Sequence, residues 1–199
     1  LLNIKEFNSY FQIPSCDKSK LSKFPEIQQQ SLFINQRSNE WFEARKVKYF
    51  PLGIIDKDQT NKYNKYNFDL TESWVNDLFH LIGGCIGELN IMYGTDWTKL
   101  FPGYEFINIG LIFDHSFNSI SPDGFLINND LLDIIPIEIK VLQKEKNLYC
   151  DPSIRELRQA RQQLDTLSSI MKIKPEKGII VFLYIESDSN VYSEYTIFN

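Results

Sequence analysis

The sequence predicts an α/β fold, in which a central mixed sheet is flanked by helices. A continuously apolar run over 179–185 is typical of a central strand that is buried on both faces. An amphipathic helical pattern over 154–171 precedes it, and extended segments bounded by turn residues come before that helix. The expected order is therefore a helix, three strands, a helix and two strands.

Length and composition agree with one domain. The chain has 199 residues, of which 43% are hydrophobic and 14% aromatic, so it can bury a substantial core. We expect one domain over 1–199, with its core over about 70–199 and an N-terminal helical segment over about 1–55. No run of about 18 apolar residues and no basic-then-apolar N-terminus is present, which disfavours membrane and secretory proteins and predicts an intracellular location.

The first half of the chain predicts two helices. Residues 15–23 are polar and are expected to form a loop, whereas 39–46 holds good helix formers with Ser38 or Asn39 as its cap. The stretch 56–67 lacks any sustained period and predicts an exposed loop. A capping box of Asp69 and Glu72 then opens a second helix.

That second helix carries apolar residues at helical spacing and has Glu88 near its end, because the segment 90–94 is expected to shorten it. Strands are predicted next over 105–113, 124–127 and 134–141, with turn chemistry at 128–130. Together they should form a three-stranded meander.

The second half of the chain predicts a helix and two further strands. Asp151-Pro152 supplies a cap and a first-turn proline for the amphipathic helix, which we expect Gly178 to break off. The apolar strand over 179–185 follows, and a strand over 191–198 completes the order after a polar turn.

The candidate catalytic residues lie in a Ser-Pro-Asp-Gly motif at 121–124 and an Ile-Glu-Ile-Lys motif at 137–140. Strand side chains alternate, so Glu138 and Lys140 should share one face while the isoleucines anchor the other. Asp123, at a bend that Gly124 permits, can converge on the same place. Two carboxylates suit Mg²⁺ or Mn²⁺, and the lysine can orient a water that attacks phosphorus. The pattern indicates a metal-dependent phosphodiesterase.

Each motif also has an ordinary interpretation. Ser-Pro-Asp-Gly is a common turn sequence, and Glu-x-Lys often forms a solvated strand face; their order, followed by a glutamine-bearing helix, favours function. Scattered Cys16, Cys85 and Cys150 argue against zinc, iron-sulfur and disulfide frameworks. His80 and His115 are the only histidines, so carboxylates must carry the chemistry. A net charge of −5 counts against bulk coating of nucleic acid but permits a nuclease.

The ordered motifs resemble the PD-(D/E)xK nuclease superfamily, and more closely its lambda-exonuclease or YqaJ-type viral recombinase branch. The resemblance rests on Asp123 followed by Glu138-x-Lys140, a Trp-x-x-x-Arg pattern at 41–45, a Gly-x-x-x-Glu pattern at 84–88, and the glutamine-rich segment 159–164. It spans residues 39 to about 185 and implies a restriction-endonuclease-like core.

The resemblance implies a role for each matched position. Asp123, Glu138, Glu88 and the backbone carbonyl of Ile139 would ligate Mg²⁺, with Gly84 leaving room beside Glu88, and Lys140 would polarise the attacking water. Gln159 would hydrogen-bond near the centre, although Gln162 and Gln163 are open alternatives. Arg45 and Ser121 would hold a terminal 5′ phosphate. Trp41 is either a nucleic-acid contact or, as its chemistry favours, a core anchor.

The expected activity is 5′-to-3′ exonuclease action on linear double-stranded DNA during viral or phage recombination or repair, located in the cytoplasm or nucleus of a host. A strand-annealing protein would be a partner, and the chain would act as a monomer or a ring trimer. Lys46 to Pro51 replace the family's Ser/Thr-bearing segment, which bears on 5′-end specificity. An endonuclease on DNA or RNA, including a cap-snatching type that would use His80, and a non-catalytic binding module are the alternatives.

Overall fold

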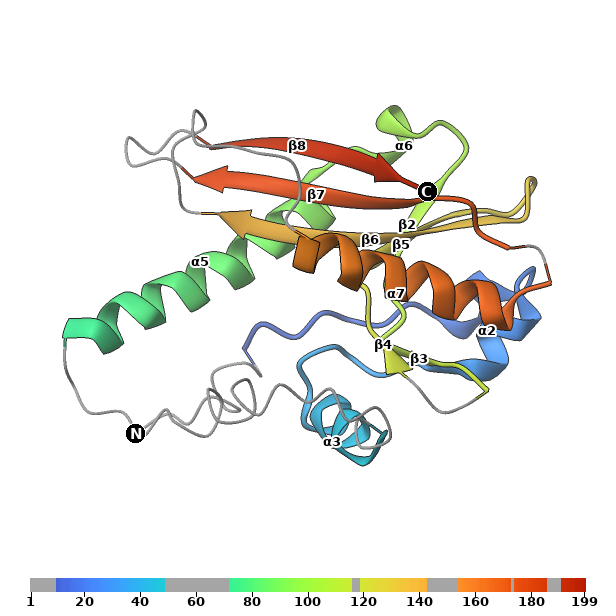
Figure 1. Ribbon diagram of the computed structural model, residues 1–199, viewed down its shortest axis with the longest axis horizontal. Helices are drawn as coiled ribbons and strands as arrows, with labels where there is room; N and C mark the ends of the chain where they lie inside the picture. Colours follow the sequence, from blue (N-terminus) through green and yellow to red (C-terminus); the bar gives the residue numbers. More distant parts are fainter. Residues whose placement is uncertain (1–9, 49–71, 116–118, 143–153, 173, 186–190) are drawn as a thin grey trace.

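The computed structural model describes residues 10–48, 72–115, 119–142, 154–172, 174–185 and 191–199 (Figure 1). Of 45–48, 72–81, 185 and 191–192 it describes the backbone alone. The predicted loop over 56–67, Asp69 of the capping box and the Asp151-Pro152 cap lie outside the described residues.

A five-stranded mixed sheet forms the centre of the molecule, in the order β2-β5-β6-β7-β8. β6 and β7 are parallel and the other neighbours are antiparallel. The strands are β2 (Glu105–Ile107), β5 (Gly124–Asn128), β6 (Asp133–Leu142), β7 (Gly178–Ile185) and β8 (Val191–Phe198). With helices on both of its faces, this sheet confirms the predicted α/β fold class.

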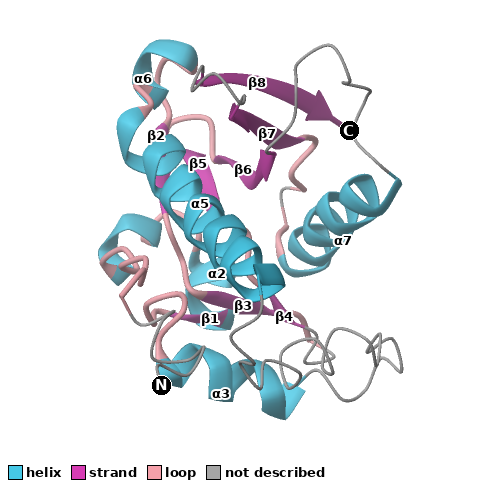
Figure 2. Ribbon diagram, turned by 90° about the vertical axis from the view of Figure 1, so that its left-hand side faces the viewer, coloured by secondary structure: helices cyan, strands magenta, loops and turns pink. Residues whose placement is uncertain are grey.

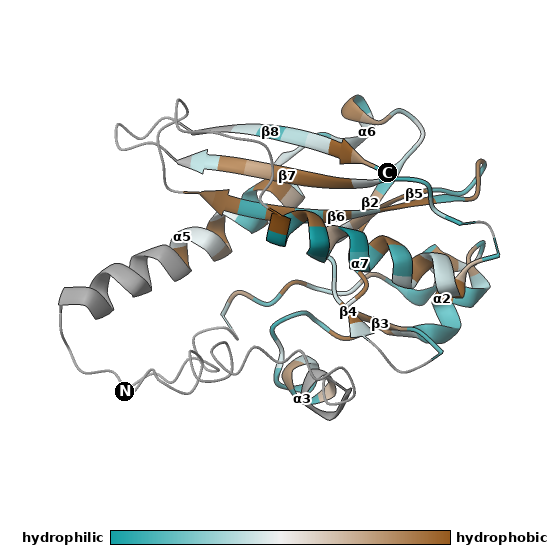
Figure 3. Ribbon diagram, in the orientation of Figure 1, coloured by the Kyte–Doolittle hydropathy of each residue, from teal (hydrophilic) through white to brown (hydrophobic). Residues whose placement is uncertain are grey.

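Two long helices, α5 (Glu72–Gly94) and α7 (Ile154–Ile170), lie on opposite sides of the sheet, as Figure 2 shows. The alternation of β7 sorts its side chains between them. Val181 and Leu183 share a buried cluster with Ile91 of α5, whereas Ile180 and Phe182 share one with Ala160 of α7. β7 is therefore coloured mostly hydrophobic in Figure 3, while α7 is hydrophilic along much of its length.

A second, three-stranded antiparallel sheet has the order β1-β3-β4, formed by β1 (Ser31–Leu32), β3 (Leu111–Phe113) and β4 (Ser119–Ile120). The single strand expected over 105–113 was therefore wrong. Gly110 breaks it with a φ of +23°, where a Cβ would lie 2.2 Å from the Ile34 carbonyl oxygen. The chain leaves β2 after Ile107 and, past Gly110, joins the other sheet as β3.

The loop expected over 15–23 was also wrong in part. It contains a 3₁₀ turn, η1 (Lys18–Leu21), and α2 (Pro25–Gln30) follows at once. Leu21, Phe24 and Ile27 are buried in a cluster that also holds Leu167 of α7. Helices this short hold too few residues to show a period, so their apolar positions could not be recognised from spacing.

The two other described helices are α3 (Asn39–Lys48) and α6 (Trp97–Leu100). Of the two predicted caps, Ser38 caps α3, because its Oγ accepts a hydrogen bond from the backbone N–H of Trp41 at 3.1 Å. Among the described residues, no helix combines the length and the apolar character needed to cross a membrane.

Two predicted helix ends were wrong. α5 continues six residues past Glu88 to Gly94, because Ile91 and Met92 are buried against the sheet and continued helix is what buries them. α7 ends at Ile170, and Gly178, expected to break that helix, is instead the first residue of β7.

Two glycines of α5 make a matched pair for testing this packing. A Cβ on Gly87 would lie 2.7 Å from a methyl carbon of Val141 and 2.9 Å from one of Leu183, whereas a Cβ on Gly84 would meet nothing within 4 Å. We expect Gly87→Ala to lower the free energy of unfolding by about 1–3 kcal/mol through overpacking. Gly84→Ala should raise it by up to about 1 kcal/mol through helix propensity. Urea denaturation measures both, and equal effects would contradict the described contact.

Candidate active site

Strand register brings the first two predicted residues together. β5 and β6 pair from Asn128 opposite Asp133 to Gly124 opposite Ile137, so the next positions along the register are Asp123 and Glu138. β6 continues past this point to Leu142 without β5 beside it. The Asp123 Oδ2 takes the place of a neighbouring strand there, accepting a hydrogen bond from the Ile139 N–H at 2.6 Å.

Glu138 is a buried carboxylate, with 4% of its surface exposed. Burial of a charge is costly unless the charge is paired and hydrogen-bonded. Three side chains do this for Glu138: Lys140 Nζ donates to its Oε1 at 2.5 Å, Gln163 Nε2 donates to its Oε2 at 2.6 Å, and Gln159 Nε2 also donates to Oε1. Both oxygens are thereby fixed in place.

Lys140 shares the face of β6 that Glu138 occupies, as alternation predicts, while Ile137 and Ile139 pack in the cluster on the α5 side. Its ammonium also donates to Gln159 Oε1 at 3.2 Å. Burial lowers the pKa of Lys140, but the nearby carboxylates, Glu138 above all, outweigh it and leave that pKa raised. Lys140 is therefore held as a cation.

The structure shows which of the three candidate glutamines of α7 contact Glu138. Gln159 and Gln163 lie one turn apart on α7, and both reach Glu138. Ala160, which is fully buried against β7, lets this turn of α7 approach the sheet closely. Gln162 is exposed and lines a cavity on the flank of the helix.

Glu88 joins the cluster from α5. Its side chain is 22% exposed and forms an ion pair with Arg37. Burial raises the pKa of Glu88, Arg37 opposes that rise, and the charge of Glu138 adds to it. Asp123 has a pKa well above the usual range for the same reasons: burial first, then the charges of Glu138 and Glu88. The three carboxylates thus form one electrostatic cluster.

Arg37 is a member of the site that the sequence did not reveal. Its Nη2 contacts Glu88 Oε2 and its Nη1 donates to the Phe11 carbonyl at 3.1 Å. It has a left-handed backbone with φ of +65°, which is uncommon for a residue with a side chain. No periodicity or motif marks such a residue, because the contact spans 51 positions along the chain.

Ser121 and Trp41 are held in a structural network. The Ser121 hydroxyl donates to the Gly110 carbonyl at 2.7 Å and accepts from Trp41 Nε1 and Gln36 Nε2, each at 3.1 Å. Trp41 is 8% exposed and packs with Leu111 and Phe113, so the core-anchor interpretation describes this structure. The side chains of Arg45 and His80 lie outside the described residues.

The donor set suits a hard cation. Glu88, Asp123 and Glu138 offer oxygen, and burial, together with the neighbouring negative charges, raises the pKa values of Glu88 and Asp123. Within the described ranges, no three acidic, histidine or cysteine side chains form a ready metal-binding group. The carboxylate oxygens are instead engaged by Ile139 N–H, Lys140 and Arg37 among others, so a cation would have to exchange with some of these donors.

Comparison with known proteins found no protein-family model and no curated sequence that matches this chain. The PD-(D/E)xK resemblance therefore stays a prediction from the motifs, and the geometry described above has to support a function by itself.

The raised carboxyl pKa values predict how stability depends on pH. In the metal-free protein the folded state holds more protons than the unfolded chain above the usual carboxyl pKa, so the free energy of unfolding falls as pH rises through the raised pKa values of Asp123 and Glu88. We expect Asp123→Asn, which keeps an acceptor for Ile139 N–H, to be more stable than the wild type at pH 7.5 and to show a weaker pH slope.

Urea denaturation between pH 4 and pH 9 in the presence of a chelator measures this prediction. Asp130→Asn, in an exposed turn, is the matched control and should follow the wild type. An Asp123→Asn protein that is less stable at pH 7.5 and keeps the wild-type slope would contradict the described repulsion.

Proposed function

We propose that this chain is a metal-dependent nuclease, with 5′-to-3′ exonuclease action on linear double-stranded DNA as the leading mode. One observation carries the proposal: Asp123, Glu138 and Lys140 meet at the point where β6 passes the end of β5, and Glu88 joins them from α5. A structural ion pair would need one carboxylate for one lysine. Burial and the neighbouring carboxylates raise the pKa values of Asp123 and Glu88, which costs stability at neutral pH, and a site for cations explains why these groups are gathered here.

Each residue of the cluster would then have its own role in phosphodiester hydrolysis. A cation held by Asp123, Glu138 and Glu88 would supply Lewis-acid stabilisation of charge on the attacking and leaving oxygens. Lys140, a cation at the rim of the cluster, would hold the attacking water by donating to its oxygen. Gln159 and Gln163 would keep the Glu138 carboxylate in one orientation while the donors around it exchange.

A cavity of about 390 Å³ along α7 supports a polymeric substrate. Its walls carry donors suited to a phosphate backbone next to the glutamines that contact Glu138. The lining residues are Asp114, Arg158, Arg161, Gln162, Asp165, Thr166 and Ser169.

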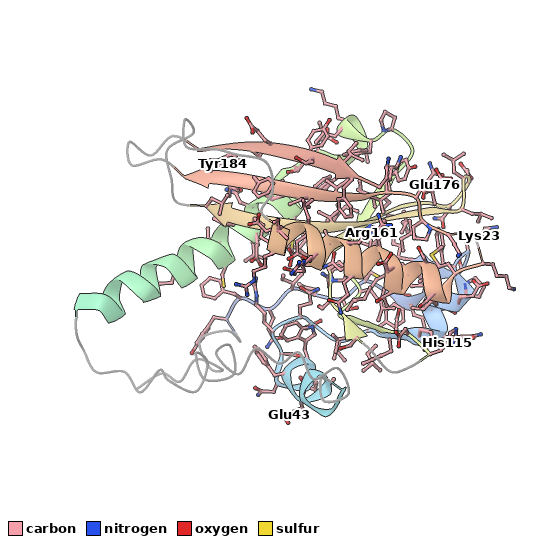
Figure 4. The ribbon with its side chains drawn as sticks, in the orientation of Figure 1. Lys23, Glu43, His115, Arg161, Glu176 and Tyr184 are labelled. Carbon is pink, nitrogen blue, oxygen red and sulfur yellow. The ribbon has the colours of Figure 1, made fainter. Side chains whose placement is uncertain are left out.

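The two arginines that line the cavity differ in their contacts with other residues. Arg161, labelled on α7 in Figure 4, pairs with Asp165 at 3.3 Å and donates to the Asn199 carbonyl. Arg158 makes no hydrogen bond or ion pair with any described residue. Arg158 is therefore the better candidate for a backbone phosphate.

A second candidate, endonuclease action on DNA or RNA, has one observation in its favour. A hydroxyl that grips a terminal 5′ phosphate must donate its proton, and the Ser121 hydroxyl donates to Gly110 instead. If Ser121 does not bind a terminal 5′ phosphate, the site has one contact fewer that would restrict cleavage to chain ends. Both candidates use the same cluster and differ in the substrate they cut.

Lys140→Ala should reduce nucleic-acid cleavage by about 10²-fold or more, the usual scale for loss of a group that acts on the attacking water. Arg155→Ala, an exposed residue of α7 that does not line the cavity, is the control and should keep the wild-type rate. The assay follows release of 5′-labelled product in Mg²⁺, with circular dichroism to show that both variants fold. Equal rates for Lys140→Ala and the wild type would refute the site.

The same assay separates the two modes. Linear duplex DNA with and without a 5′ phosphate, closed circular DNA and RNA are compared in Mg²⁺ and in Mn²⁺. Loss of linear duplex with circles spared supports the exonuclease, whereas cleavage of circles or RNA supports the endonuclease. No cleavage of any of these substrates would overturn the proposed function.

Arg158→Ala should weaken binding of a DNA duplex by about threefold to tenfold and reduce the slope of log affinity against log salt by about one, as loss of one phosphate contact does. Fluorescence anisotropy in the Lys140→Ala background, where DNA stays intact, measures this at several salt concentrations. Arg155→Ala removes the same charge outside the cavity. Equal losses for both arginines would indicate bulk attraction and not a defined path.

A further inference from the structure

Arg37 is held in the carboxylate cluster by two bridged segments, residues 11–13 and 36–38, which together are called the strap. Ile13 and Gln36 form an isolated antiparallel bridge, with hydrogen bonds of 3.1 and 2.9 Å. Gln36 then donates its side-chain N–H to the Pro122 carbonyl at 2.7 Å, one residue before Asp123. The backbone of Arg37 is thereby fixed between the Asp123 turn and α5.

The guanidinium of Arg37 has N–H donors that its contacts with the described residues do not use. A guanidinium has five N–H groups in a planar fork. One N–H meets the Phe11 carbonyl and one meets Glu88, and the remaining three make no hydrogen bond with any described residue. The side chain is 14% exposed, so part of it remains accessible from solvent. The unused donors suit the non-bridging oxygens of a phosphate diester, which take a planar fork well.

Charge gives a reason for Arg37 to occupy Glu88 in the free protein. Glu88, Asp123 and Glu138 stand against the cations of Lys140 and Arg37, so pairing with Arg37 offsets part of the repulsion. A cation in the cluster would perform the same neutralisation. Arg37 and a cation are then alternatives at Glu88, and the guanidinium becomes available when it is displaced.

We propose that Arg37 is a substrate-binding residue, held on Glu88 in the free protein and transferred to the phosphodiester when Glu88 is required by the cation. This inference rests on the proposed nuclease function and names the group that grips the substrate. The strap keeps the Arg37 backbone in place, so the transfer needs a change of side-chain torsion and no movement of the sheet.

Three variants of one residue separate this role from a structural one. Arg37→Ala removes the guanidinium and keeps the strained backbone. Arg37→Gly removes it too but suits a φ of +65°, so a loss of stability caused by backbone strain is relieved. Arg37→Lys keeps the charge without the fork. Lys20→Ala, which removes an exposed lysine paired with Glu105, is the matched control.

Two binding measurements on the full chain test the transfer. The first is calorimetric titration with Mn²⁺ in the absence of nucleic acid, where Arg37→Ala and Arg37→Gly should bind about fivefold or more tightly than the wild type, because Glu88 no longer has a competing cation. The second is anisotropy with a DNA duplex in the Lys140→Ala background, where both variants should bind about tenfold more weakly and Arg37→Lys should be intermediate.

A structural role predicts the opposite sign in the first measurement. If Arg37 only braces Glu88, its removal leaves that carboxylate misplaced and Mn²⁺ binds more weakly, with DNA affinity unchanged. That result overturns the proposal, as would weaker Mn²⁺ binding in Arg37→Ala that is restored in Arg37→Gly. Lys20→Ala should match the wild type in both titrations.

A different result would refute the proposed function. Absence of cleavage on every substrate removes the nuclease, but it does not decide how Arg37 behaves toward Mn²⁺ and DNA. If the wild type cleaves and the Arg37 variants neither gain Mn²⁺ affinity nor lose DNA affinity, the function stands and the transfer is refuted.

Discussion

The hydrogen bond from the Ile139 N–H to Asp123 Oδ2 is the contact on which the site depends. β6 is longer than the strand beside it, and an uncovered strand edge inside a protein must find other partners for its N–H groups. A carboxylate at the end of β5 satisfies one of them and thereby lies beside Glu138. The same contact completes the strand edge and concentrates negative charge.

The two long helices bring the remaining side chains to the cluster. α7 follows β6 in the chain and precedes its parallel neighbour β7, so it is the helix of the crossover and must lie on one face of the sheet. That face is the one that Glu138 occupies, and two glutamines of α7 therefore reach the carboxylate. α5 lies on the other side and brings Glu88 to the open edge of β6. Each layer contributes one part of the cluster.

Much of this arrangement could be predicted because it depends on short-range patterns. Alternation along β6 placed Glu138 and Lys140 on one face, and the apolar run of β7 indicated a central strand. What could not be predicted depends on distant contacts. Gly110 separates β2 from β3 where the Ile34 carbonyl leaves no room for a Cβ, and Arg37 meets Glu88 across a loop closure that no local pattern records. Of the three candidate glutamines, spacing alone could not decide which turn of α7 the sheet would approach.

The strap and the sheet also differ in how firmly they are held. An isolated bridge with two backbone hydrogen bonds fastens Ile13 to Gln36, whereas β6 and β7 pair over six successive positions. Segments with fewer such bonds open at lower free energy than the core of a fold. The bridge beside Arg37 should therefore open at lower free energy than the sheet, while Leu21, Phe24 and Ile27 of α2 stay packed in the core. The carboxylates on the sheet and the arginine that pairs with them then differ in local stability.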